Sequence, residues 1–264
     1  LPARRLLERG VRGVPPYLPL AQVVTCLVPT GGWGMRRKPP GAEDAGGRGP
    51  ARPAIPPAPP TIRPARDLAE VASFLQRILS RAQLAPVWTE AELASPDRSR
   101  GLTPGDFLVA EGQGGEVTGC VALWDQRAFK QSRVQGYPPA LGTLRPLLNP
   151  LRSLVGAPRL PPPGAVLPMA FLSHLGLAED DPATFLALVS SARAVARARG
   201  LDWLATGFVR GHPLLPVLEG ATRPRSYETV LYALPWSPAA PEDPSLASLL
   251  AGSGPGLQVE VATL

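Results

Sequence analysis

Residues able to do acid–base, nucleophilic or metal chemistry are few in this sequence. Its 264 residues include two cysteines and two histidines. Cys26 and Cys120 are too few for a disulfide framework or a four-thiolate zinc site, and the histidines lie far apart, so we predict no metal site. We expect Cys120 to be inert core. We expect His174, which lies in an apolar strand, to be a buried and hydrogen-bonded histidine, and the alternative is a catalytic base. His212 either caps the last predicted helix or faces a site.

A polar and aromatic cluster follows one predicted strand. Residues 124–131 read Trp-Asp-Gln-Arg-Ala-Phe-Lys-Gln. Trp124, Asp125 and Arg127 are our candidates for contacting a substrate. An ordinary surface loop is the alternative, and the sequence leaves both open.

Three acids precede the best-defined helix of the chain. Glu179, Asp180 and Asp181 come before Pro182, and the apolar residues that follow have helical spacing up to Gly200. Acids at a helix N-terminus stabilise the helix by about 0.3 to 1 kcal/mol each. This terminus is therefore expected to cap itself rather than to receive an anion.

Charge is distributed unevenly along the chain. Residues 1–66 hold 11 basic and 3 acidic residues, whereas residues 67–264 hold 16 basic and 18 acidic residues. The larger part has no basic footprint for nucleic acid, so a nucleic-acid partner is unlikely and would depend on the N-terminal charge alone. No apolar run reaches the roughly 20 residues that span a bilayer, and we expect no membrane partner and a cytoplasmic location.

Hydrophobic periodicity predicts an α/β fold around one mixed sheet with flanking helices. The predicted strands are residues 20–28, 61–65, 107–111, 116–124, 167–178, 201–208 and 227–234. The predicted helices are residues 4–8, a helix capped by Asp67, a short helix capped by Thr89, residues 181–200 and residues 213–219.

Composition divides the chain into segments. Residues 1–30 read as a helix plus a strand, and residues 31–60 as a disordered Pro/Gly linker. Residues 61–236 form the main domain, and residues 237–264 form a tail. Within the domain, residues 132–166 interrupt the order of elements. Because Pro146 and Pro150 break the helical spacing there, we expect short helical pieces laid over the sheet as a flap, either as packed structure or as a substrate lid.

The first 29 residues echo residues 212–236. Each segment reads as a helix, a glycine, a tyrosine (Tyr17 or Tyr227), a strand and a proline. If the echo is real, the chain begins inside the end of one copy of a domain and continues with a full second copy.

The order of elements from Thr61 to Trp236 resembles the GNAT superfamily of acyl-CoA-dependent N-acyltransferases. The resemblance covers about two-thirds of the chain. It is carried by Ile62-Arg63-Pro64-Ala65 before a helix, by the hairpin strands 107–111 and 117–123, by Leu172-Ser173-His174-Leu175-Gly176-Leu177 before the long helix, and by Arg199-Gly200-Leu201-Asp202 before a strand. The echo suggests a tandem-GNAT protein that lacks most of its first copy, with which this domain would pair.

The resemblance implies a mechanism. The strand before the long helix would diverge from its neighbour, and backbone groups of Leu175, Gly176 and Leu177 would bind the pantetheine arm of acetyl-CoA or another acyl-CoA. Amides there would polarise the thioester carbonyl. Glu179 is the candidate base, and Tyr227 and Tyr232 are candidate acids for the leaving thiolate. Tyr232 is alternatively a packing residue of its strand.

One motif departs from the family. The family's pyrophosphate loop, Gln/Arg-x-x-Gly-x-Gly/Ala, is replaced by Glu179-Asp180-Asp181-Pro182-Ala183-Thr184, which has no glycine. Either the cofactor is gripped elsewhere or this copy has lost it. The predicted function is acetyl transfer to the amine of a small molecule or a protein. The alternative is a non-catalytic GNAT-like domain that serves as the partner or ligand-binding half of a tandem protein.

Overall fold

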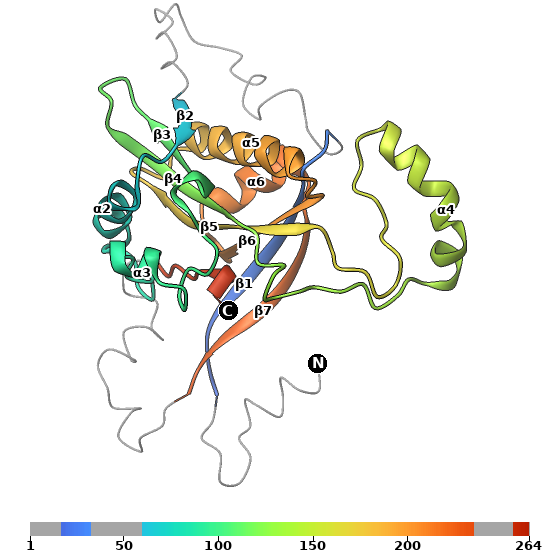
Figure 1. Cartoon of the computed structure of the whole chain (residues 1–264). Coiled ribbons are helices and arrows are strands. Elements are labelled where there is room, and N and C mark those ends of the chain that lie inside the picture. The colour runs from blue at the N-terminus through green and yellow to red at the C-terminus, as the bar shows by residue number, and fades with distance from the viewer. Residues whose placement is uncertain (1–16, 33–59, 235–255, 264) are drawn as a thin grey trace, which may run out of the picture.

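The computed structural model describes residues 17–32, 60–234 and 256–263. The helix predicted at residues 4–8 and most of the predicted linker lie outside these ranges. The described residues form one sheet of seven strands with helices on both faces (Figure 1). The predicted α/β fold with a mixed sheet is therefore confirmed.

The sheet has the order β2-β3-β4-β5-β6-β1-β7. The β5–β6 pair is parallel and every other neighbouring pair is antiparallel. The strands are β1 (Leu18–Pro29), β2 (Thr61–Pro64), β3 (Phe107–Glu111), β4 (Val117–Trp124), β5 (Met169–Leu177), β6 (Trp203–Val209) and β7 (Arg225–Ala233).

Helices cover the two faces because successive strand residues point to opposite sides. Phe107 and Val109 of β3 pack with α2 (Leu68–Leu79) and α3 (Glu90–Ala94), whereas Leu108 and Ala110 face α5 (Pro182–Ala198) and α6 (Leu214–Thr222). The predicted caps are confirmed for the first two helices. Asp67 accepts a hydrogen bond from the Glu70 amide, and the Thr89 hydroxyl accepts one from Glu92.

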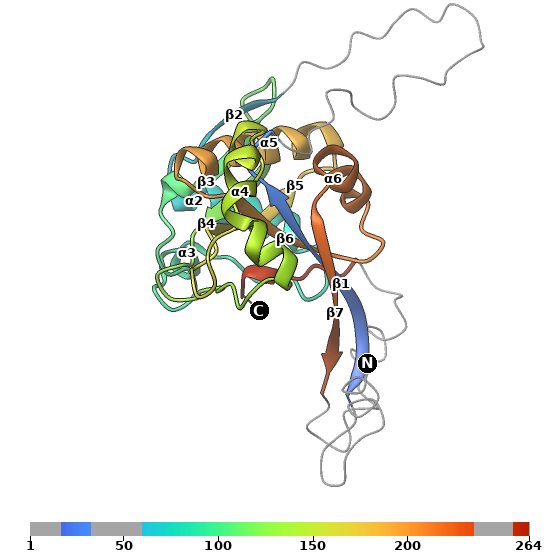
Figure 2. The same ribbon diagram turned by 90° about the vertical axis from the view of Figure 1, so that its right-hand side faces the viewer.

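Strand β1 is the sixth of the seven strands across the sheet, next to the edge strand β7, although it is the first described strand in the chain. It pairs with β6 on one side and β7 on the other, and together β1 and β7 extend beyond the rest of the sheet (Figure 2). The two echoing segments are thus neighbours, with Thr25 opposite Tyr227. The strand expected in segment 1–30 belongs to the same sheet as residues 61–236, and its origin in a first copy stays a prediction.

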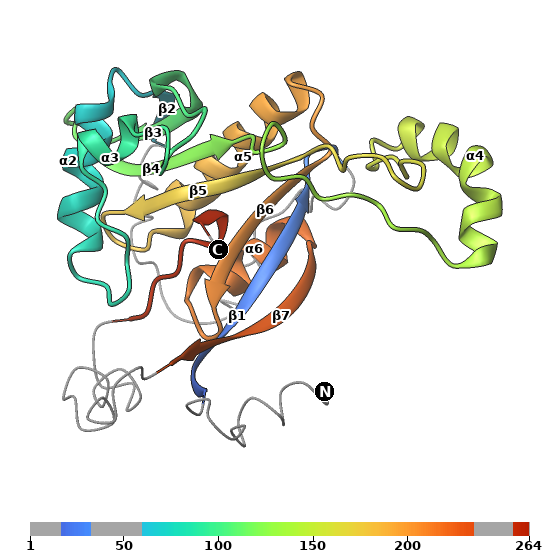
Figure 3. The ribbon, with the colours of Figure 1, turned by 60° about the horizontal axis from the view of Figure 1, so that its bottom comes forward.

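The segment at residues 132–166 differs from the expected flap. Its helix α4 (Pro139–Leu154) continues through Pro146 and Pro150, has no buried residue, and stands away from the sheet (Figure 3). The expected break is wrong because the two missing amide donors lie four residues apart on one solvent-facing side, where water can reach the freed carbonyls. The returning chain is held by hydrogen bonds from Arg145 and Asn149 to the Leu160 carbonyl.

The end of the predicted tail returns to the sheet. Leu257 forms a parallel bridge with Gln83, and Val261–Thr263 form a single turn of 3-10 helix against β5 and β6. Ala262 is 3% exposed. Residues 256–263, here called the docked segment, are therefore part of the folded domain.

Candidate active site

Strands β5 and β6 diverge after a short pairing. Their register runs only from Met169↔Trp203 to Phe171↔Ala205. Beyond it, the β6-facing edge of β5 has no strand partner among the described residues. This is the divergence that the GNAT resemblance predicts, and it leaves backbone donors and acceptors of β5 available to something other than a strand.

A bulge shapes the free edge of β5. Gly176 lies opposite Cys120 and Ser173 opposite Ala122, so two β5 residues, His174 and Leu175, face one residue of β4. His174 has a φ of 53°, in the left-handed region that non-glycine residues rarely adopt. The bulge therefore turns the His174 amide out of the β4 pairing and toward the gap between β5 and β6.

The side chain of His174 anchors this bulge. It is 1% exposed, and its ring lies 4.2 Å from that of Trp88 and 5.7 Å from that of Trp124. Its Nδ1 lies 2.9 Å from the Ser173 hydroxyl, whereas its Nε2 has no partner among the described residues. Burial lowers the pKa of His174 to about 3. The predicted buried histidine is confirmed, with one of its two nitrogens hydrogen-bonded, and it is neutral.

Two side chains of the docked segment occupy the free edge of β5. The His174 amide donates to Glu260 Oε2 at 2.6 Å, and Gln258 Nε2 donates to the Leu175 carbonyl at 2.9 Å. Glu260 Oε1 also accepts from the Ala262 amide at 3.1 Å. Burial raises the pKa of Glu260 to about 7, against the effect of these two hydrogen bonds. A carboxylate oxygen thus binds the backbone amide that the bulge turns toward the gap.

Neither residue was singled out from the sequence, although a signal is present. Residues 257–262 read Leu-Gln-Val-Glu-Val-Ala, an alternation typical of an extended segment with one polar face. Gln258 and Glu260 form that polar face, and both bond to β5.

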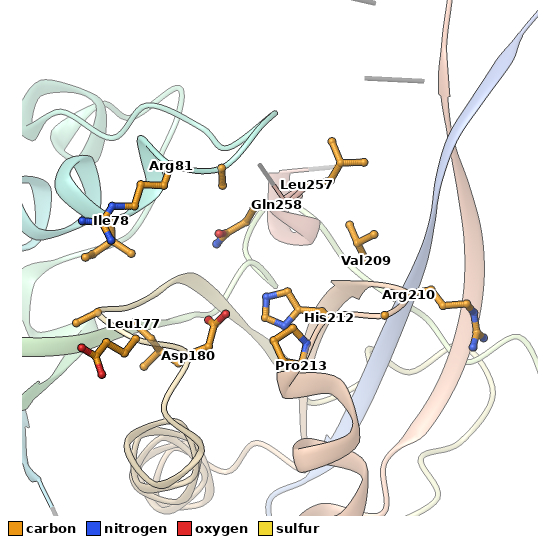
Figure 4. Close-up of a pocket in the computed structure, with 15 residues that line it drawn as sticks. Ile78, Arg81, Leu177, Asp180, Val209, Arg210, His212, Pro213, Leu257 and Gln258 are labelled. Atoms are coloured by element: carbon orange, nitrogen blue, oxygen red, sulfur yellow. The ribbon is translucent and has the colours of Figure 1, made fainter. Parts of the chain in front are cut away.

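A cavity of about 560 Å³ opens where β5 and β6 end. It is lined by the ends of α2, β5 and β6, the start of α6 and the docked segment (Figure 4). Two predicted cofactor-binding positions differ in placement: Leu177 lines the cavity, while Leu175 and Gly176 lie further along β5 toward the bulge. Glu179, the predicted base, also lines the cavity and is exposed.

Charges around this cavity have mixed signs. Asp180 lines it together with Glu179, and Arg81 does so from the end of α2. Arg210 points away toward β7, where it forms an ion pair with Glu228 (Figure 4). Among the described residues, Arg81 is thus the lining arginine without a carboxylate partner.

His212 both bonds to the start of the last helix and faces a cavity, the two alternatives that the sequence left open. Its Nδ1 accepts from the Leu214 amide at 3.2 Å, at the first residue of α6, and its side chain lines the cavity. Burial lowers its pKa, and the nearby Asp180 opposes that shift.

The N-terminus of α5 caps itself, as predicted. Asp181 accepts hydrogen bonds from the Thr184 amide at 2.8 Å and the Ala183 amide at 3.3 Å. Bonds from Thr184 and Ala183 hold the pKa of Asp181 below its usual range, against the effect of burial. Because these amides are already used by an anionic side chain, the terminus does not fit a diphosphate.

The two predicted catalytic tyrosines lie away from the cavity. Tyr227 and Tyr232 are on β7, and β1 separates that strand from β6. Tyr227 is 53% exposed, and the Tyr232 ring packs edge-on against Tyr17 at 6.0 Å. A proton donor must lie within hydrogen-bond reach of the leaving group, so this placement argues against the predicted acid role. The reason is the insertion of β1, which the order of elements does not reveal.

The predicted substrate residues separate into two groups. Trp124 is 4% exposed and lines a second cavity of about 600 Å³. Asp125 and Arg127 instead bind each other, with Arg127 Nη2 2.7 Å from Asp125 Oδ2. The hydrogen-bonded Arg127 lowers the pKa of Asp125, which outweighs the effect of burial. This pair does not line the second cavity.

The described part of the chain gives little support for a metal site, a membrane span or a reactive cysteine. Within it, no group of three or more His, Cys, Asp or Glu side chains is placed to hold a metal ion. No helix there is long and apolar enough to cross a membrane. Cys120 is fully buried, as predicted, and burial raises the pKa of its thiol and brings that of Cys26 to about 11.

Comparison with known proteins gives structural neighbours only. No protein-family model matches the sequence, and no curated protein matches it. Similar solved structures include a GCN5-related N-acetyltransferase from Sphaerobacter thermophilus, with 15% identity and a TM-score of 0.45 over 88% of this chain and 56% of that one. Another is Saccharomyces cerevisiae N-myristoyltransferase with bound myristoyl-CoA and inhibitors, with 13% identity and a TM-score of 0.42 over 81% of this chain and 49% of that one.

The chain thus spans about half the length of the two solved structures. Likenesses at these identities and TM-scores carry no argument about activity.

Proposed function

We propose that this protein is an acyl-CoA-dependent N-acyltransferase that transfers an acetyl group to an amine. One observation carries the proposal. The bulged edge of β5 turns the His174 amide and the Leu175 carbonyl toward the gap between β5 and β6, where they bond to Glu260 and Gln258, and a cavity of about 560 Å³ lies where the two strands end. An extended amide-containing arm can add to such an edge as a strand would.

The backbone of β5 supplies binding and polarisation. Leu175, Gly176 and Leu177 would hold the pantetheine arm, and the His174 amide would donate to the thioester oxygen. In the structure that amide donates to Glu260 Oε2 at 2.6 Å, so Glu260 has to leave it before the thioester oxygen takes its place. Donors fixed in this way stabilise negative charge as it develops in the transition state.

The chemical step needs a base for the acceptor amine. The deprotonated amine attacks the thioester carbon, a carbon–nitrogen bond forms, the carbon–sulfur bond breaks, and the thiolate leaves. Glu260 suits the base role because its pKa of about 7 is near neutral pH and its carboxylate touches the polarising amide. Glu179, at the cavity wall, is the second candidate.

The diphosphate of the donor has to be gripped away from α5. Asp181 occupies the first amides of that helix. Arg81, which lines the same cavity from α2, is the cation placed to take part. We expect Arg81→Met to weaken acetyl-CoA binding by a few-fold, in line with the loss of one charge-assisted contact.

The proposal is tested by cofactor binding and by two carboxamide variants. Acetyl-CoA at about one hundred times its Kd should stabilise the fold by about 2.7 kcal/mol, seen as a higher melting temperature. Glu260→Gln should lower kcat more than it changes KM for acetyl-CoA, and Glu179→Gln is its matched comparison. If Glu179→Gln alone lowers kcat, the base is Glu179; if neither does, proton removal by a carboxylate is rejected.

A non-catalytic role is the second candidate, and two observations favour it. The docked segment already occupies the free edge of β5, and the terminus of α5 is closed by Asp181. This role predicts no change in melting temperature at millimolar acetyl-CoA. Such a result, together with no acyl transfer to any amine, would replace the enzyme by a GNAT-like partner domain.

A further inference from the structure

The second cavity is built from three separate parts of the chain. Its volume is about 600 Å³. It is lined by the loop between α3 and β3, by the turn after β4, and by Ala262 and Thr263 of the docked segment. In the turn, the Gln126 carbonyl accepts from the amides of Phe129 and Lys130 at 3.0 and 2.7 Å. These bonds hold the backbone from which the two side chains project.

The wall of this cavity carries excess positive charge. Arg98, Arg100 and Lys130 line it, against one acid, Asp97. Arg98 is paired with Glu92 at 3.3 Å. Neither Arg100 nor Lys130 has a carboxylate partner among the described residues, which leaves two cations available to a ligand.

Aromatic rings hold these two cations in place. The Arg100 guanidinium lies 5.6 Å from the Phe129 ring centroid, and the Lys130 ammonium lies 5.5 Å from that of Phe171. The Arg100 carbonyl also accepts from the Trp124 indole at 2.8 Å. The positive charges are therefore positioned by the fold.

Gln126 offers a hydrogen-bond acceptor to the same cavity. It lines the cavity but is only 2% exposed, and its Nε2 donates to the Ala262 carbonyl at 3.0 Å. Its Oε1 has no hydrogen-bond partner among the described residues. A buried acceptor without a donor costs about 1 to 3 kcal/mol, which a ligand N–H would recover.

This arrangement lies next to the proposed reaction centre. Trp124 lines the cavity, and its ring is 5.7 Å from that of His174. Ala262 accepts from Gln126 on one side and donates to Glu260 on the other. A single residue thus separates the cavity from the carboxylate that is the candidate base.

We propose that the cavity binds the acceptor substrate, and that this acceptor is a primary amine carrying an acidic group, either a carboxylate or a phosphate. The inference rests on the proposed acyltransferase function and names its substrate class. The acidic group binds Arg100 and Lys130, and the amine donates to Gln126 Oε1, which turns its nitrogen toward Glu260. An amine without an acidic group makes only the hydrogen bond to Gln126 Oε1.

The test uses the full chain and three primary amines with short aliphatic chains. O-phosphoethanolamine presents a phosphate, γ-aminobutyrate a carboxylate, and propylamine no acid. Binding of each is measured by calorimetry without acetyl-CoA, and acyl transfer is measured with it. The variant is Arg100→Met with Lys130→Met. Its matched control is Arg66→Met with Arg225→Met, which removes two exposed arginines that line neither cavity.

We expect at least one acidic amine to bind the wild-type chain ten times more tightly than propylamine. The cavity variant should reduce that ratio to less than threefold at an unchanged melting temperature, and the control should keep it. Which acidic amine binds more tightly distinguishes a phosphate from a carboxylate substrate. Equal binding of all three amines, or a ratio that the cavity variant leaves unchanged, overturns the inference.

Failure of the proposed function has a different signature. Selective binding of an acidic amine, without any effect of acetyl-CoA on melting temperature, would keep the anion site and reject the acyltransferase, and with it the acceptor role. Acetyl-CoA binding and turnover without amine selectivity would keep the enzyme and reject the site.

Discussion

Glu260 links the state of one proton to the stability of the fold. Its pKa of about 7 is above the ordinary value of 4.5, so between these pH values the folded chain holds a proton that the unfolded chain has released. Its contribution is therefore complete below about pH 4.5 and is lost as the pH rises through 7. At about 1.4 kcal/mol per pKa unit, the effect is on the order of 3 kcal/mol.

Glu260→Gln removes this titration, so the variant should gain stability relative to the wild type as the pH rises from 4.5 to 8. His174 has the opposite effect on the wild-type chain: because its pKa is lowered to about 3, it lowers the free energy of unfolding as the pH falls below about 6.5. The readout is accordingly the difference between variant and wild type in urea denaturation at several pH values. Two parallel profiles would contradict the assignment.

Gly207 sets how closely the docked segment approaches β6. A Cβ at this position would lie 2.0 Å from Val261 Cγ2, which is far inside van der Waals contact. We expect Gly207→Ala to cost about 1 to 3 kcal/mol or to displace the segment. Adding Val261→Ala should restore most of the melting temperature, and a double variant as unstable as the single one would show that the clash lies elsewhere.

At the scale of elements, the long helix α5 was the most predictable part of the fold. Asp181, Pro182 and Gly200 mark its ends, and these signals are local, so no knowledge of distant contacts is needed. The hairpin β3–β4 and the strand before α5 were predictable for the same reason. The bulge at His174 was not, since it depends on pairing with β4.

Helix α4 shows where local rules mislead. Pro146 and Pro150 predict a break, yet the helix continues because none of its residues is buried and water can satisfy the carbonyls. The docked segment was missed for the opposite reason: its place depends on bonds to β5, which lies more than 80 residues earlier in the chain.

The exposure of α4 makes a sharp prediction about stability. Leu147 and Leu154 are 71% and 83% exposed. Changing both to Gln should alter the free energy of unfolding by no more than about 0.5 kcal/mol. Leu188→Ala, in the fully buried face of α5, should cost about 2 to 5 kcal/mol. Urea denaturation of both variants checks this, and a large loss in the double variant would mean that α4 packs on the body in solution.

At the scale of the whole molecule, β1 is held by a buried cation. Arg193 of α5 is 5% exposed, and its Nε and Nη2 donate to the carbonyls of Pro29 and Gly31 at 2.8 and 2.5 Å. Arg193→Met should leave both acceptors unsatisfied and cost about 1 to 3 kcal/mol. Arg197→Met, one turn further along the helix, is the control that should have little effect. A melting temperature equal in both variants would refute this anchoring role.

The sheet can be completed only after β1 has paired with β6 and β7, which come much later in the chain. Pro29 pairs with Trp203 and Thr25 with Tyr227, so residues made early during synthesis must wait for residues made late. Pairing over such separations is slow, and β6 and β7 stay without their common neighbour until it happens. A cut anywhere between residues 32 and 60 would separate β1 from the other six strands of the sheet. If the two fragments regain the native fold only when they are mixed, their recombination would report directly on the step at which β1 enters the sheet.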